Sequence, residues 1–254
     1  MNVNKKFFAY SLYFVLLVSS SVSARVESVN APNVAEGDDW VYSLTEEKAV
    51  APGGGMVSTT RRIETTITRA GTKSFSVSVK QIDSTGLPKE ILLNSDWSAS
   101  KNVNGQMVVM NRPYDFPLTP GKEWKLDISA NAPTPAIKVE KIIKHYAVIG
   151  WTDIKVPAGT FHALKVEMEG EWSKEFTEIG PSASAEVAKG NGNSVSLAKT
   201  TGPRTPKPVG GKLYAAFWYV PEIKSHVKSI IEDYYPGGGL HSRITEELES
   251  EHVN

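Results

Sequence analysis

The stretch that decides the fold runs from Ile154 to Trp172 and reads IKVPAGTFHALKVEMEGEW. Its Pro157-Ala158-Gly159 segment predicts a tight turn, because Pro157 fixes its own φ and Gly159 tolerates conformations that other residues avoid. After the turn, largely apolar residues alternate with charged ones: His162, Leu164, Val166, Met168, Gly170 and Trp172 against Lys165, Glu167, Glu169 and Glu171. This period of two predicts an antiparallel strand with one packed face and one face in water.

Strand patterns of this kind recur along the chain. They cover residues 40–44, 57–68, 75–82, 90–97, 99–103, 106–110, 124–128, 136–151, 213–220 and 226–235. Asn104-Gly105 predicts a two-residue hairpin turn. For residues 139–146 a helix is the competing interpretation, but β-branched residues dominate there and no helix cap is present. The type of 240–249 stays open, because its apolar spacing fits either a helix or a strand.

The amino-terminal residues have the pattern of a secretory signal peptide. Lys5 and Lys6 precede an apolar run over 7–18, and small residues lead up to Ala24. The run is shorter than the roughly 20 residues that a transmembrane helix needs. We therefore expect residues 1–24 to be a signal peptide and residues 25–254 to be a single β domain. The expected location is periplasmic or secreted, with no membrane span after signal cleavage.

Composition excludes several kinds of chemistry. The chain has no cysteine, which rules out disulfides, thiolate zinc sites, iron–sulfur clusters, thiol catalysis and a lipid-modified amino-terminal cysteine. Its 28 Lys and Arg balance its 28 Asp and Glu, so nucleic acid is not an expected partner. We expect no cofactor.

The composition changes between residues 177 and 211, where Gly, Ser, Ala, Pro, Lys and Thr dominate. Few of these residues suit a core, and so long a connection inside a domain is unusual. We expect a long, flexible, low-complexity insertion that serves as a linker, with a functional lid as the alternative.

No catalytic or metal-binding constellation stands out. There is no Gly-x-Ser-x-Gly motif, and the five histidines lack the spacing of a metal pair. Adjacent carboxylates such as Asp38-Asp39 and Glu246-Glu247 point to opposite faces of a strand and are expected to be solvated. The row formed by Glu167, Glu169 and Glu171 is interpreted as exposed surface, and His162 as a core or rim histidine.

Aromatic residues are the remaining candidates for a site, since all six Trp fall on or beside predicted strands. Their rings either fill a closed core or, if the sheet is curved, line a cavity for an apolar or sugar-like ligand. For the second case we name five candidate ligand-binding residues: Trp124, Trp172, Phe217, Trp218 and His162.

Three short motifs carry a family resemblance: residues 37–42 (GDDWVY), residues 156–161 (VPAGTF) and residues 218–221 (WYVP). In that order they resemble a widespread group of bacterial secreted and periplasmic proteins that form a domain family of unknown function. The resemblance implies a mainly β fold with a curved antiparallel sheet, a half-barrel or open barrel similar to periplasmic lipoprotein carriers. It implies no catalytic residues, and the 177–211 insertion departs from the compact pattern of the group.

These observations favour a non-enzymatic exported protein that binds a hydrophobic ligand or a cell-envelope component on a concave sheet. A lipid, a glycan or an envelope protein would be the partner. One alternative is an interaction or structural module that uses an exposed sheet edge. A second alternative is a hydrolase with a dispersed site built from His162 and the acidic row of Glu167, Glu169 and Glu171.

Overall fold

The computed structural model of the chain describes residues 28–254, except residues 104, 179, 181, 191 and 192. The predicted signal peptide therefore lies outside the described residues. The described part is built almost entirely of strands: β1 (Asp39–Ala49), β2 (Met56–Ala70), β3 (Ser74–Gln81), β4 (Lys89–Asn94), β5 (Ala99–Val103), β6 (Gln106–Asn111), β7 (Glu123–Thr134), β8 (Ile137–Val156), β9 (Gly159–Phe176), β10 (Ser182–Gly190), β11 (Asn193–Thr201), β12 (Val209–Val220), β13 (Ser225–Tyr234) and β14 (Leu240–His252).

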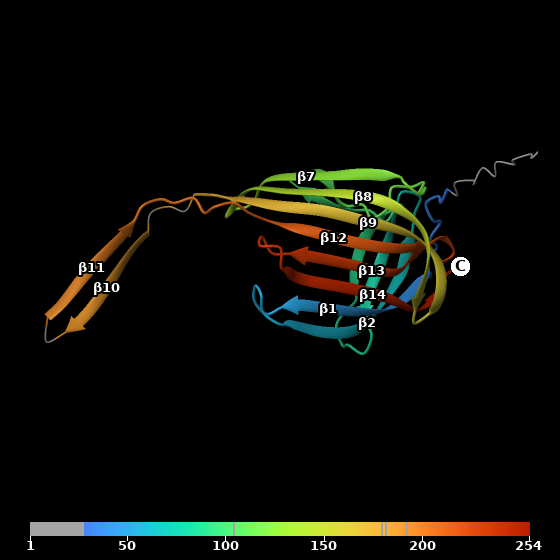
Figure 1. Cartoon of the computed structure of the whole chain (residues 1–254), viewed down its shortest axis with the longest axis horizontal. Helices are drawn as coiled ribbons and strands as arrows, with labels where there is room; N and C mark the ends of the chain where they lie inside the picture. The colour runs from blue at the N-terminus through green and yellow to red at the C-terminus, as the bar shows by residue number, and fades with distance from the viewer. Residues whose placement is uncertain (1–27, 104, 179, 181, 191–192) are drawn as a thin grey trace, which may run out of the picture.

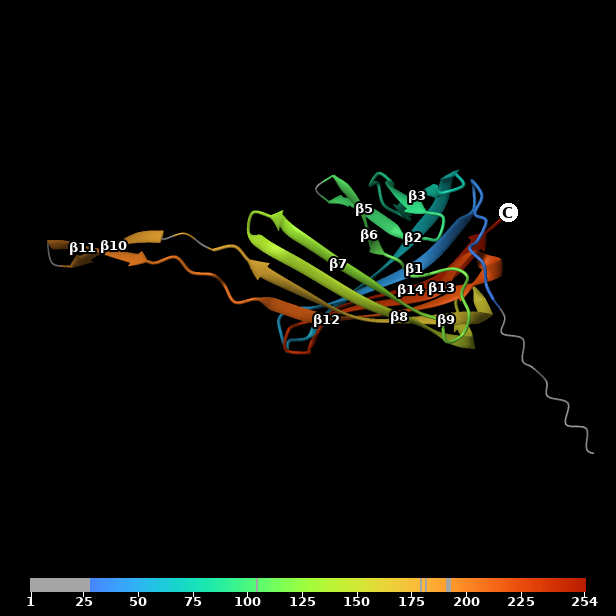
Figure 2. The ribbon, with the colours of Figure 1, turned by 90° about the horizontal axis from the view of Figure 1, so that it is seen from above.

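Ten of these strands form one antiparallel sheet in the order β4-β3-β2-β1-β14-β13-β12-β9-β8-β7. The sheet curves like a half-barrel: β7 to β2 run across the front of Figure 1, and the strands that follow fold behind them. From above, β3, β5 and β6 lie on one side of the long strands (Figure 2). Strands β4 and β7 remain the two edges, so the sheet is open. The predicted fold class, mainly β with a curved antiparallel sheet, is confirmed.

Residues 154–172 form the tip of the β8–β9 hairpin and most of strand β9. Val156 pairs with Gly159 across the turn, and Gly159 has a φ of 143°, a conformation that favours glycine. On β9, Leu164, Val166 and Met168 are buried, whereas the charged residues between them are partly exposed. The period-two prediction for this strand is therefore confirmed.

The carboxyl-terminal segment, whose type the sequence left open, is strand β14. It pairs with β1 on one side and β13 on the other, with Tyr42 opposite Leu248 and Glu247 opposite Lys228. The last strand thus lies in the middle of the sheet beside the first strand. Strand β12 is also central, with both of its faces largely buried towards its carboxyl end, as its continuous apolar run predicts.

The low-complexity segment 177–211 is not a structureless connection. Its β10 and β11 strands pair with each other as an antiparallel hairpin, and its end enters β12. Figure 1 shows this hairpin extending away from the main sheet. The pairing was missed because small and polar residues give a weak strand pattern.

The three motifs that carry the family resemblance meet in one hydrophobic cluster. Trp40, Val156, Phe161 and Val220 belong to it or pack against it. The indole of fully buried Trp40 donates a hydrogen bond of 2.9 Å to the carbonyl of Ile223, just after the third motif. These motifs therefore hold one end of the sheet together. Within the described residues, no helix has the length and apolar character needed to cross a membrane.

Candidate ligand-binding site on the concave face

The pairing of the strands places a continuous set of side chains on the concave face, because residues opposite each other in adjacent strands share a face. One row across the sheet joins Val166, Phe217, Ser229, Glu246 and Leu44. This row contains apolar residues from three strands, one serine and one carboxylate.

Two further rows lie about 7 Å and about 14 Å from the first row along the strands. Side chains on the same face are two residues apart, and each residue adds about 3.2–3.4 Å. The nearer row contains Tyr146, Met168, Ala215, Ile231 and Ile244. The farther row contains Lys144, Gly170, Leu213, Asp233 and Ser242. The concave face is therefore mainly apolar, with polar groups at a few fixed positions.

One end of this face is covered by the connection between β6 and β7. Tyr114 packs against Phe217 and Tyr219, with ring centroids 6.0 and 4.9 Å apart, and Phe116 packs beside it. Leu118 is fully buried in the same cluster. This connection closes one end of the half-barrel.

The covering segment is fastened by polar contacts to β8. The Oδ1 atom of Asn111 accepts hydrogen bonds from the ammonium of Lys144, at 3.2 Å, and from the hydroxyl of Tyr146, at 3.1 Å. Burial lowers the pKa of Lys144 and raises that of Tyr146. Asn111 thus satisfies two polar groups that would otherwise lie in an apolar surrounding.

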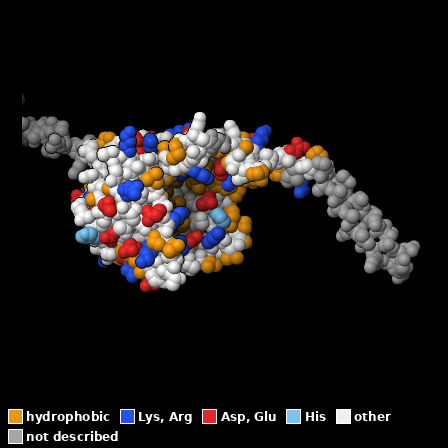
Figure 3. Space-filling model, turned by 180° about the vertical axis from the view of Figure 1, so that it is seen from behind, with side chains coloured by type: hydrophobic (Ala, Val, Ile, Leu, Met, Phe, Trp, Pro, Cys, Tyr) orange, Lys and Arg blue, Asp and Glu red, His pale blue; other side chains and the backbone are white. Residues whose placement is uncertain are grey.

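Away from the cover the concave face stays open. Ile231 is 43% exposed there, although its neighbours Ala215 and Met168 are buried. Seen from behind, this side of the molecule is hollowed, with hydrophobic side chains around the hollow and charged and histidine side chains within it (Figure 3). We call the recess on this face, which carries the paired residues Ile231 and Ile244, the concave hollow.

A polar cluster lies at the closed end of the hollow. Glu246 Oε2 accepts a hydrogen bond from Ser229 Oγ at 2.9 Å and lies 3.0 Å from Nε2 of His226. The Glu246 and His226 side chains keep exposures of 22% and 21%. Burial alone would raise the pKa of Glu246, but the contacts with His226 and Ser229 outweigh it and lower that pKa. Glu246 is therefore an ionised carboxylate deep in the hollow.

Tyrosines surround this cluster. The ring of Tyr42 stacks on His226 with centroids 5.0 Å apart, and its hydroxyl donates to the His226 carbonyl at 2.8 Å. Tyr114 is 2% exposed, and among the described residues its hydroxyl has no hydrogen-bond partner. Burial, followed by the nearby Tyr219, Tyr42 and Glu246, raises the pKa of Tyr114 well above its usual value.

Three of the five predicted ligand-binding residues share the concave face. Trp124 stacks on Tyr146 at 5.1 Å and donates to the carbonyl of Arg112, so it supports the covering segment. Phe217 is 7% exposed and lies under Tyr114. Trp172 is partly buried in the open half and donates to Asp233 at 3.1 Å.

The other two predicted ligand-binding residues, Trp218 and His162, lie outside the concave hollow. Trp218 is on the convex face, between the ammonium groups of Lys165 and Lys228, which are 5.2 and 6.0 Å from its ring centre. His162 is 65% exposed near the tip of the β8–β9 hairpin, stacked on Trp151 and 2.6 Å from Asp153. It is a rim histidine, with a carboxylate as its partner.

The residues proposed for a hydrolase do not come together. Glu167 and Glu169 alternate with His162 and Leu164 along β9, so they point to the opposite face. Glu167 pairs with Lys165 and accepts from Tyr214 on that face. The acidic row and His162 therefore form no common site.

The sequence reasoning missed the polar cluster. Glu246 and Asp38 were expected to be solvated, yet Glu246 faces the hollow and Asp38 is fully buried. The prediction that adjacent carboxylates point to opposite faces is correct, since Glu247 pairs with Lys228 on the convex side. The alternation of 240–248 would have placed Glu246 with Ile244 and Leu248 had that segment been assigned as a strand.

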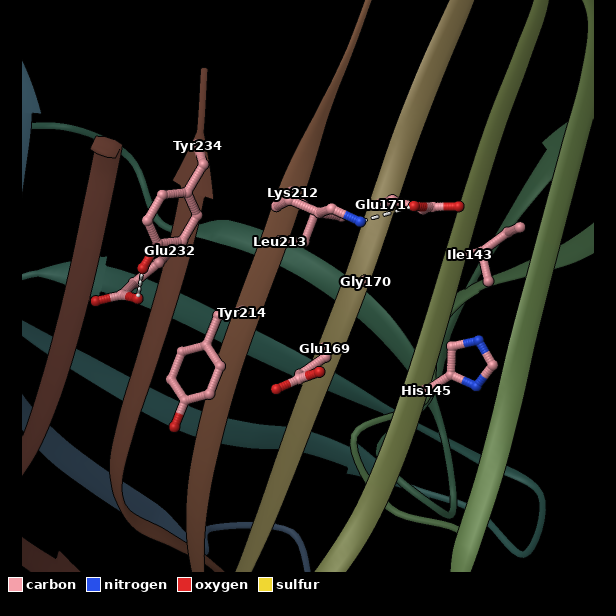
Figure 4. Close-up of a pocket in the computed structure, with 10 residues that line it drawn as sticks. All are labelled: Ile143, His145, Glu169, Gly170, Glu171, Lys212, Leu213, Tyr214, Glu232 and Tyr234. Atoms are coloured by element: carbon pink, nitrogen blue, oxygen red, sulfur yellow. Dashed lines mark hydrogen bonds and ion pairs between the residues drawn. The ribbon is translucent and has the colours of Figure 1, made fainter. Parts of the chain in front are cut away.

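A second recess of about 700 Å³ lies on the convex face and is shown in Figure 4. It is lined by residues of β8, β9, β12 and β13, among them Lys212, which pairs with Glu171 at 2.9 Å. Glu232 is held by Arg243 and Tyr234. Burial and the neighbouring Glu167 raise the pKa of Tyr214 to about 12. Since Lys212, Glu171 and Glu232 already have partners, we regard the concave hollow as the better candidate.

No protein-family model matches the chain, and no curated protein matches it. Solved structures similar to it include a protein assigned as exported, with a YmcC-like fold, from Bacteroides fragilis, at 15% identity and a TM-score of 0.40. That match covers 89% of this chain and 99% of the other. A protein assigned as a lipoprotein from Parabacteroides distasonis has 12% identity and a TM-score of 0.43, covering 89% of this chain and 100% of the other. Likenesses at this level support no inference about ligand, activity or location.

Proposed function

We propose that this protein is an exported, non-enzymatic binding protein that holds an apolar or amphipathic ligand in the concave hollow. The observation that carries the proposal is the exposure of Ile231, which is 43% exposed between Ala215 and Ile244 on a mainly apolar sheet face. A recess with apolar walls and a few fixed polar groups is the usual form of a small-molecule site.

The proposed location follows from the leader pattern of residues 1–24, which lie outside the described residues. The lack of cysteine means that such a protein would fold without disulfides. A stable curved sheet with one open, apolar side suits a carrier or sensor of a molecule that is poorly soluble in water.

The first experiment is direct. The full chain, with its leader, is exported from a bacterial host, purified without detergent and examined by native mass spectrometry, followed by solvent extraction. The proposal expects either a co-purified apolar molecule or saturable binding of an added probe such as 1-N-phenylnaphthylamine. A protein that neither carries nor binds any apolar molecule would overturn it.

Two isoleucine variants locate the binding. Ile231→Lys introduces a charge into the hollow, whereas Ile149→Lys does the same on the convex side, where Ile149 is 54% exposed. We expect Ile231→Lys to weaken probe binding by about tenfold or more, which corresponds to about 1.4 kcal/mol, and Ile149→Lys to leave it unchanged. Equal effects of the two variants would place the probe outside the hollow.

A further inference from the structure

We propose that the polar end of the ligand is a hydroxyl or ammonium group that donates a hydrogen bond to Glu246, and that carboxylate-ended ligands are excluded. This inference rests on the proposed function and specifies the ligand class. It is drawn from the arrangement of Glu246, Tyr114 and the apolar rows between them and the opening.

One carboxylate oxygen of Glu246 accepts hydrogen bonds from neighbouring side chains, and the other is available to a ligand. Both His226 Nε2 and Ser229 Oγ contact Oε2, at 3.0 and 2.9 Å. Among the described residues, none donates to Oε1. Because an ionised carboxylate has about four acceptor positions, Glu246 can accept a further donor from a bound molecule.

Tyr114 supplies the complementary group. Its hydroxyl is buried and, within the described part of the chain, unpartnered. Its ring lies 6.0 Å from Phe217, whose ring is in turn 6.4 Å from His226. The Phe217 ring is therefore close to both Tyr114 and His226. A buried hydroxyl without a partner destabilises the fold, so a ligand that bonds to it gains that contact.

A ligand hydroxyl can donate to Glu246 or accept from Tyr114, and an ammonium can donate to either group. A carboxylate has no proton to donate at neutral pH and would place a second negative charge beside Glu246. In a recess with few polar groups that repulsion is only weakly screened by solvent.

The apolar body of the ligand has a continuous path from this point. Phe217 and Glu246 belong to the innermost row. Ala215 and Ile231 belong to the next row towards the opening, and Leu213 belongs to the row after that. The two steps from the row of Phe217 to the row of Leu213 each add about 7 Å, so the path is about 14 Å long. An extended chain of about ten carbons has a similar length. The ligand's polar end would therefore lie deepest.

The test compares three ligands of equal chain length: decan-1-ol, decylamine and decanoate. Their affinities are measured at pH 7 by displacement of the same naphthylamine probe from the exported protein. We expect the alcohol and the amine to bind about tenfold more tightly than decanoate. Glu246→Gln should reduce this preference to about twofold or less. Glu247→Gln, which changes the neighbouring convex-face residue, should leave it intact.

Tyr114→Phe is the second variant, because Glu246→Gln can disturb the His226 contact and hence the fold. It removes only the unpartnered hydroxyl, and we expect it to weaken decan-1-ol binding more than it weakens binding of the probe. If no ligand binds the unaltered protein, the proposed function fails and this inference fails with it. If all three bind alike, if Glu246→Gln keeps the full preference, or if Tyr114→Phe leaves decan-1-ol binding unchanged, the proposed function stands and the assignment of the polar end is wrong.

Discussion

The side chains of Trp172 and Asp233 are joined across the width of a strand. The indole Nε1 of Trp172, on β9, donates a hydrogen bond of 3.1 Å to Oδ1 of Asp233, on β13. Strand β12 runs between them, and Gly211 lies under the indole. The bond exists because Gly211 has no side chain, and it fixes the largest aromatic ring in the open half of the hollow.

Replacing Gly211 by alanine should displace this ring. A Cβ at Gly211 would lie 2.8 Å from Trp172 Nε1 and even closer to the carbonyl of Tyr234. Forcing atoms into such a contact typically costs about 1–3 kcal/mol. We expect Gly211→Ala to lower the free energy of unfolding by about that amount and to change the Trp fluorescence. Gly237→Ala, where a Cβ meets nothing within 4 Å, is the control; an equal loss there would contradict the prediction.

Asn111→Ala should loosen the segment that covers the closed end of the hollow. It removes the acceptor for the Lys144 ammonium and the Tyr146 hydroxyl and leaves both without this partner. Because buried polar groups that lose a partner are costly, we expect a loss of about 2 kcal/mol in urea unfolding. Asn102→Ala, at an exposed position of β5 beside the turn of the same hairpin, should cost roughly 0.5 kcal/mol or less. Similar losses for the two variants would show that Asn111 is not a fastening point.

The sequence predicts the features of this fold that depend on neighbouring residues better than those that depend on contacts between residues far apart in the chain. Local alternation was enough to place most strands, since the side chains of residues 162–172 alternate whatever the partner strand is. The dominance of β-branched residues and the lack of a helix cap favoured a strand over a helix for 139–146, which lies within β8. Residues 240–249 could not be settled, because Leu240, Ile244 and Leu248 are four apart and so fit both periods.

The candidate site depends on contacts that local patterns do not contain. Glu246 and His226 are 20 positions apart, and they share a face through a register shift after Trp218. Tyr114 comes from a proline-rich connection with no strand pattern, yet it covers Phe217. Aromatic residues on the strands pointed to Trp124, Trp172 and Phe217. The polar groups between them become visible only when the strand order is known.

The ion pair of Arg243 with Glu232 should contribute more to stability than a more exposed pair of similar length. Arg243 Nε lies 2.6 Å from Glu232, whose side chain is 10% exposed. Arg62 Nε lies 2.6 Å from Glu249, but Arg62 is 51% exposed. We expect Arg243→Gln to lower the free energy of unfolding by about 2 kcal/mol, because a buried carboxylate loses its partner.

Arg62→Gln is the matched comparison for Arg243→Gln. Since water solvates both partners of an exposed pair, its expected cost is roughly 0.5 kcal/mol or less. Urea unfolding of the two variants side by side decides the question. If both variants lose the same stability, the burial of Glu232 has no energetic consequence.

Asp38 should make the stability of the protein depend on pH. Its carboxylate is fully buried and accepts from the backbone N–H groups of Asn254 and Ala35, both at 2.8 Å, and from Lys224 at 2.9 Å. Burial alone would raise the pKa of Asp38, but these contacts outweigh it and lower the pKa below 3.8. The folded protein therefore favours the ionised form more than the unfolded chain does.

The sign of the pH effect follows from that difference. The stabilisation from Asp38 is complete above the unfolded pKa of about 3.9 and is lost as the pH falls through the lower folded value. At pH 7 we expect Asp38→Asn to cost about 3 kcal/mol, because Lys224 loses its buried partner. At pH 2 to 3 the gap between the variant and the unaltered protein should narrow, as measured by thermal unfolding. Asp127→Asn, at a carboxylate that is 57% exposed, is the control and should change little at either pH. A gap that stays constant from pH 7 to pH 2 would show that the charge of Asp38 is not what stabilises the fold.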